Sequence, residues 1–116
     1  MNINKILLCG AKGRMGQAIS KIAAEHGCEI TAPIDQGDNP ESRINDCDAV
    51  IDFSLADATL PMAKIASKAG KPMVIGTTGH EKSVKQEIIV TMKSIPVVWA
   101  GNFSTGVNLL FYLTQQ

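Results

Sequence analysis

The stretch Lys5-Ile-Leu-Leu-Cys-Gly-Ala-Lys-Gly-Arg-Met-Gly16 decides the fold of this chain. Four apolar residues, Ile6 to Cys9, run directly into a turn with glycines at positions 10, 13 and 16. Apolar residues then recur at helical spacing from Met15 onward and end near His26-Gly27, where Gly27 suits a helix C-terminus. The stretch therefore predicts a buried strand, a tight glycine turn and the start of a helix.

The glycine turn favours an anionic ligand. Backbone amides in the first turn of a helix have no partner within the helix and carry the positive end of its dipole. Glycines let a diphosphate approach those amides closely. Asp35 follows Gly16 by nineteen positions, close to the expected place of a ribose-binding carboxylate. The alternative is an ordinary strand-to-helix turn that needs glycine for steric reasons only.

Composition narrows the class of protein. The chain has 116 residues, enough for one domain, and its eleven basic residues balance eleven acidic ones. This balance favours neither nucleic acid nor an acidic membrane surface as a partner. No apolar run is long enough to span a membrane, and Met1 to Lys5 leads directly into a strand, so we expect a cytoplasmic protein.

The three cysteines, Cys9, Cys28 and Cys47, have unrelated spacings and no C-x-x-C pair. We expect free thiols and no metal centre, with Cys9 acting as a small core residue.

The remaining pattern alternates between strands and helices. Thr59 and Pro61 predict the start of a helix that closes at Gly70, and a further helix is expected over 81–94. Residues 36–48 are expected to form a loop with at most one helical turn. Strands are expected at 29–34, 49–53, 72–75 and 96–100. The alternation predicts an α/β fold, a doubly wound parallel sheet with helices on both faces.

Asp35 bears on the choice of nucleotide. At the end of its strand, a carboxylate can accept hydrogen bonds from both adenosine ribose hydroxyls, and it would repel a 2′-phosphate. No arginine lies beside it in Asp35 to Asp38, which favours NADH, although Lys12 in the glycine turn could still accept NADPH. The alternative for Asp35 is a turn-forming aspartate before Gly37.

Three further features remain. Gly76-Thr-Thr-Gly79 ends a strand and brings Thr77 or Thr78 near the same crevice. His80 is interpreted as a turn or cap residue rather than an acid or base. The apolar tail from Gly106 to Gln116 is expected either to pack against a partner or to continue into further chain.

Four signatures in this order carry a family resemblance: Gly10-Ala-Lys-Gly-Arg-Met-Gly16, Ile51-Asp-Phe-Ser54, Val74-Ile-Gly-Thr-Thr-Gly79 and Ala100-Gly-Asn-Phe-Ser-Thr-Gly-Val-Asn108. Together they closely resemble the N-terminal domain of the 4-hydroxy-tetrahydrodipicolinate reductase family. The resemblance implies a Rossmann-type dinucleotide-binding domain over 1–105. It also implies that 106–116 begins the connection to a C-terminal substrate and oligomerisation domain that this sequence lacks.

The resemblance also implies site residues. Those around the pyrophosphate would be Gly10, Lys12, Gly13, Arg14, Met15 and Gly16, with Asp35 on the adenosine ribose. Phe53 and Ser54 would border the cofactor. Gly76, Thr77, Thr78, Asn102 and Phe103 would surround the nicotinamide, and Thr78 would touch substrate.

The activity that the resemblance implies is hydride transfer from NADH or NADPH to a cyclic imino acid, in the diaminopimelate route to lysine. Family members with a lysine like Lys12 and an Asp-x-Gly-Asp stretch use both nucleotides, which tempers the preference for NADH. The family's His-His-x-x-x-Lys motif is absent from these residues, so we expect no catalytic residue here and cofactor binding with slow turnover or none.

The resemblance implies a homotetramer for the full-length protein and leaves the oligomeric state of this chain open. Two alternatives to the function of a reductase domain stay open: a non-catalytic NAD-binding regulatory module, and the first lobe of another small-molecule dehydrogenase.

Overall fold

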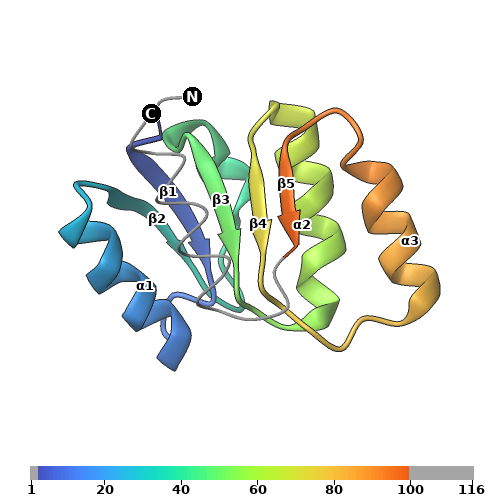
Figure 1. Ribbon diagram of the computed structural model, residues 1–116, viewed down its shortest axis with the longest axis horizontal. Helices are drawn as coiled ribbons and strands as arrows, with labels where there is room; N and C mark the ends of the chain where they lie inside the picture. Colours follow the sequence, from blue (N-terminus) through green and yellow to red (C-terminus); the bar gives the residue numbers. More distant parts are fainter. Residues whose placement is uncertain (1–2, 100–116) are drawn as a thin grey trace.

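The protein is described here by a computed structural model covering residues 3–99. Five parallel strands form one sheet in the order β2-β1-β3-β4-β5, with helices on both of its faces (Figure 1). The strands are β1 Lys5–Cys9, β2 Glu29–Ile34, β3 Ala49–Asp52, β4 Met73–Ile75 and β5 Val97–Trp99. This confirms the predicted α/β doubly wound parallel sheet. Its strand order reverses between β1 and β3, the position where such sheets bind ligands.

Helix α1, Arg14–Glu25, lies on one face of the sheet, while α2, Ala56–Ala69, and α3, Lys82–Thr91, lie on the other (Figure 1). Side chains along a strand alternate between the two faces, so β1 supplies both cores. One core holds Ile6 and Leu8 with Ile19 and Ala23 of α1. The second holds Leu7 and Cys9 of β1 with Met62, Ala63 and Ala66 of α2, with Ile88 of α3 and with Met92, which caps the C-terminus of α3. Because helices pack on both faces, they hold the sheet in place and with it the loops that follow its strands.

Two predicted helix boundaries are wrong. Helix α2 begins at Ala56 rather than at Thr59, so Pro61 lies inside it. Leu55 is extended at the N-cap and Asp57 stands in the first turn, where its charge suits the helix dipole. Thr59 is fully buried, and its hydroxyl donates to Asp52 instead of beginning the helix. Helix α3 is also shorter than the expected 81–94.

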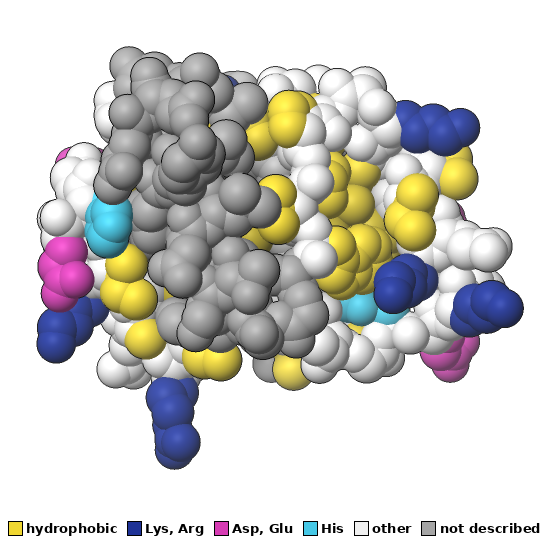
Figure 2. Space-filling view, in the orientation of Figure 1, with side chains coloured by type: hydrophobic (Ala, Val, Ile, Leu, Met, Phe, Trp, Pro, Cys, Tyr) yellow, Lys and Arg dark blue, Asp and Glu magenta, His cyan; other side chains and the backbone are white. Residues whose placement is uncertain are grey.

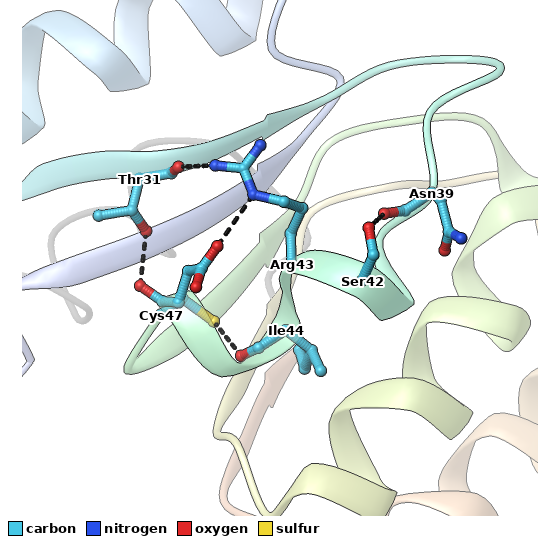
Figure 3. A network of polar contacts seen from close by, with 7 residues as sticks. Thr31, Asn39, Ser42, Arg43, Ile44 and Cys47 are labelled. Atoms are coloured by element: carbon cyan, nitrogen blue, oxygen red, sulfur yellow. Dashed lines mark hydrogen bonds and ion pairs between the residues drawn. The ribbon is translucent and has the colours of Figure 1, made fainter.

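A short 3₁₀ helix, η1 Glu41–Asp46, carries the chain from β2 to β3 (Figure 3). Its six residues make about two 3₁₀ turns, more than the one helical turn expected in this loop. The Arg43 guanidinium binds the Thr31 carbonyl of β2 and, at 3.0 Å, the Asp46 carboxylate. Thr31 Oγ1 donates to the Asp46 carbonyl at 2.9 Å. These bonds hold η1 against β2 and so fix the connection between β2 and β3.

All three cysteines are free and buried. Burial raises the pKa of the Cys9 thiol, with the nearby Asp52 and Asp35 charges adding to the effect. Burial also raises the pKa of Cys47. Within residues 3–99, no helix combines the length and the apolar character that crossing a bilayer requires.

The raised pKa values predict that the folded protein resists alkylation by iodoacetamide at about pH 8, because the reactive thiolate form is depleted. Because burial favours the neutral thiol, the raised pKa values also contribute to the free energy of unfolding below the ordinary thiol pKa. This contribution is lost as the pH rises through the raised pKa values. Intact mass should show little labelling of the native protein and labelling of all three cysteines in urea. Rapid modification of Cys9 in the folded chain would contradict the prediction.

Candidate functional site

The site begins where β1 and β3 end side by side. The Phe53 N–H donates to the Cys9 carbonyl at 3.1 Å, so the turns that follow these two strands touch. Gly10 has φ +83°, and a Cβ there would lie 2.4 Å from the Phe53 carbonyl oxygen. Only glycine fits this position, because any side chain would both strain the backbone and separate the two strand ends.

The first turn of α1 is open at its N-terminus. Its N-cap, Gly13, has no side chain to bond the turn, and no acidic residue stands in that turn. Among residues 3–99, the N–H groups of Arg14, Met15 and Gly16 have no hydrogen-bond acceptor. Three free donors at the positive end of a helix dipole form a site suited to an anion such as a phosphate group.

Gly16 lets the glycine turn close onto α1. A Cβ on Gly16 would lie 2.1 Å from the Gly10 carbonyl oxygen and 2.7 Å from that of Ala11. By contrast, a Cβ on Gly13 would meet only the Gly10 oxygen, at 3.4 Å. The close approach therefore depends on Gly16, which packs behind the turn rather than on its outer surface.

Asp35 stands directly after the C-terminal end of β2, as the sequence predicts. Its Oδ1 accepts the Lys12 N–H at 3.0 Å, which ties the glycine turn to the end of β2. The Asp35 N–H in turn donates to Asp38 Oδ2 at 2.9 Å. In the described part of the chain Asp35 Oδ2 has no hydrogen bond, so this oxygen can accept from a ligand hydroxyl.

A cavity of about 630 Å³ lies in front of these strand ends. Five of the predicted cofactor residues line it: Gly10, Gly13, Asp35, Phe53 and Ser54. Apolar side chains form the rest of one wall, namely Pro40, Leu55, Ala58, Pro61 and Met62. Lys12, Arg14 and Met15 are exposed at the glycine turn and do not line the cavity.

The predicted residues after β4 lie next to this cavity. A Cβ on Gly76 would lie 2.1 Å from the Phe53 ring, so the ring packs directly on this glycine. Thr77 Oγ1 accepts the Ser54 N–H at 3.0 Å and donates to the Asp52 carbonyl at 3.2 Å. Loops after β3 and β4 are thereby joined. The predicted residues Asn102 and Phe103 lie outside the described residues.

Thr77 and Thr78 line a second cavity of about 740 Å³, together with His80, Lys85 and Trp99. Figure 2 shows hydrophobic side chains gathered over the β5 and α3 side of the molecule, with Lys or Arg and a histidine beside them. The predicted site thus divides into an acidic side at Asp35 and a more basic side beyond Thr78.

The sequence analysis expected a strand over 49–53 and gave Asp52 no role in the site. Its carboxylate is fully buried and accepts the Ser54 N–H at 3.0 Å, the Ser54 hydroxyl, and Thr59 Oγ1 at 2.8 Å. The signal was present, because a buried carboxylate requires several donors and hydroxyl residues follow at positions 54 and 59.

His80 was interpreted as a turn or cap residue rather than an acid or base. It lies in the loop between β4 and α3, and the cap alternative is wrong. The N-cap of α3 is Glu81, and no side chain bonds the first turn of that helix. His80 Nε2 instead lies 2.8 Å from Thr59 Oγ1, and the imidazole meets the Trp99 ring edge-on at a centroid distance of 5.4 Å.

Fold and site together define a Rossmann-like nucleotide-binding domain: a doubly wound parallel sheet whose glycine turn opens onto an uncapped helix. The family described as "Dihydrodipicolinate reductase, N-terminus" matches residues 4–103. The chain belongs to this family. Its members are NAD(P)H-dependent reductases, and the N-terminal domain binds the nucleotide.

Relatives named 4-hydroxy-tetrahydrodipicolinate reductase match nearly the whole chain. The protein from Akkermansia muciniphila is 42% identical over 113 residues, covering 96% of this chain and 46% of the relative. That from Methanocorpusculum labreanum is 35% identical over 126 residues, covering 96% and 50%. A third, from Magnetococcus marinus, is 44% identical over 80 residues, covering 69% and 30%. The chain spans about half the length of the first two.

The packing of the glycine turn predicts a sharp difference between two alanine substitutions. Gly16→Ala should lower the free energy of unfolding by about 1–3 kcal/mol, because its Cβ would collide with backbone atoms that cannot rotate away. Gly13→Ala is the matched control: its φ is −69° and the nearest atom is at an ordinary distance. Urea unfolding of both variants measures the difference, and equal losses would show that the turn does not close as described.

Proposed function

We propose that this chain is the nucleotide-binding part of a 4-hydroxy-tetrahydrodipicolinate reductase and that it binds NADH or NADPH. The observation that carries the proposal is the open first turn of α1: its N-cap, Gly13, lines the cavity bordered by Asp35, and the next three N–H groups have no acceptor among the described residues. Both features lie at the carboxyl ends of the strands, on the side where doubly wound sheets hold nucleotides.

The residues present fit a dinucleotide. Close packing at Gly10 and Gly16 fixes the turn, and exposed Gly13 carries no side chain beside the first turn of α1, so a diphosphate could approach the amides of Arg14 to Gly16. Asp35 Oδ2 would accept the adenosine ribose hydroxyls, and the apolar wall near Pro61 and Met62 would cover the adenine. Lys12 and Arg14, exposed at the turn, would add positive charge beside the phosphates.

The nicotinamide would extend toward Phe53, Gly76 and Thr77, where the loops after β3 and β4 are hydrogen-bonded to each other. When bound, the cofactor supplies the hydride for reduction of a cyclic imino acid. This chain's residues would hold the ring in place, and Thr78 would meet the substrate on the outer side of the loop.

The proposal assigns the whole enzyme to the diaminopimelate route to lysine, in the cytoplasm. Groups outside 1–105 would bind the substrate carboxylates, supply the proton and assemble a homotetramer, as the family resemblance implies. Residues 1–105 would supply the nucleotide-binding part of that enzyme.

NADH titration tests the proposal directly. Fluorescence of NADH mixed with the protein should saturate at micromolar to sub-millimolar concentration. The absence of a saturable signal up to millimolar NADH would contradict a nucleotide-binding role.

Asp35→Asn tests the ribose contact and the choice of nucleotide. The amide oxygen can still accept the Lys12 N–H, but the charged acceptor is lost, so NADH binding should weaken by about 1–3 kcal/mol. NADPH should weaken less, because repulsion of its 2′-phosphate is also removed. Glu29→Gln is the matched control, since Glu29 is an exposed carboxylate at the opposite end of the same strand. Equal losses for both nucleotides would refute the assignment.

A further inference from the structure

A chain of three side chains connects the loop after β4 to the end of β3. His80 Nε2 lies 2.8 Å from Thr59 Oγ1, and Thr59 Oγ1 lies 2.8 Å from Asp52 Oδ2. Thr59 and Asp52 are both fully buried. Gly79, just before His80, has φ +92°, a backbone conformation that glycine adopts readily. The chain can therefore turn there and bring the imidazole back to α2.

The direction of these hydrogen bonds follows from the donors available. A carboxylate only accepts, and a threonine hydroxyl has a single hydrogen to donate. Thr59 therefore donates to Asp52, and His80 must donate its Nε2–H to Thr59. A neutral His80 is then fixed as the Nε2–H tautomer.

The same carboxylate holds the neighbouring loop. Asp52 Oδ1 accepts hydrogen bonds from both the N–H and the hydroxyl of Ser54, while Oδ2 accepts one from the Thr59 hydroxyl. One buried group thus fixes the loop after β3 directly and the loop after β4 through Thr59 and His80. On its other side the imidazole is held by the edge-on Trp99 ring, over which Lys85 Nζ lies at 5.2 Å from the ring centroid.

We propose that His80 is a positioning residue for the nicotinamide end of the site. By bonding Thr59, it anchors the outer end of the Thr77–Gly79 segment to Asp52 and keeps that segment at a fixed distance from Phe53 and Ser54. This inference rests on the proposed nucleotide binding. It concerns only the nicotinamide half of the dinucleotide, which lies away from the glycine turn.

The test compares NADH with ADP-ribose, which has the adenosine, the diphosphate and both riboses but no nicotinamide. His80→Ala removes the bond to Thr59, and Thr59→Val removes both bonds of the chain. For each variant we expect NADH affinity to fall about three- to tenfold and ADP-ribose affinity to change by less than about twofold. Two conservative variants serve as matched controls. Thr59→Ser keeps the hydroxyl and His80→Gln keeps a donor near Nε2, so both should stay within about twofold of the wild type for NADH.

Equal weakening of both ligands would overturn the positioning role, because it would indicate a general loss of structure. Unchanged NADH affinity in His80→Ala would overturn it as well. A wild-type protein that binds neither ligand would instead refute the proposed function, and the positioning role with it. The ¹⁵N spectrum of the imidazole tests the hydrogen-bond chain separately: we expect the Nε2–H tautomer for neutral His80, and the Nδ1–H tautomer would contradict the chain whatever the nucleotides do.

Discussion

The close contact between the glycine turn and the first turn of α1 is the constraint on which the rest of the site depends. The Gly10 carbonyl lies where a side chain on residue 16 would have to be, so the turn presses directly on the helix. This contact leaves Arg14, Met15 and Gly16 as an uncapped first turn without an acidic side chain. An uncapped helix end that also lacks acidic neighbours leaves free energy to be gained from an anion.

A second constraint is the buried carboxylate of Asp52. Burying a charge is costly unless donors surround it, and here Ser54 and Thr59 supply them. Because those donors belong to the loop after β3 and to α2, satisfying the charge also sets where both segments lie. Thr77 then joins the loop after β4 to the same residue, by donating to the Asp52 backbone carbonyl. The polar network therefore sets the relative positions of α2 and the loops after β3 and β4.

The sequence was enough to predict the sheet, because buried parallel strands and a glycine turn are visible in short windows. Strand β2 matches its expected limits, and Asp35 lies where its spacing from Gly16 suggested. The start of α2 was mispredicted because the combination of Thr59 and Pro61 resembles an N-terminal signal, whereas Thr59 is bonded to a residue seven positions earlier. The partner of His80 is 21 positions away in the sequence, and no local pattern reveals a contact of that kind.

The most direct test of the account is an NMR titration of the ¹⁵N-labelled protein with NADH. The account predicts that the backbone amides of Arg14, Met15 and Gly16 shift strongly and saturate together, while adenosine, which lacks phosphates, leaves them nearly unchanged. Saturable NADH binding that perturbs other amides but leaves these three in place would contradict the central claim that the open end of α1 holds the diphosphate.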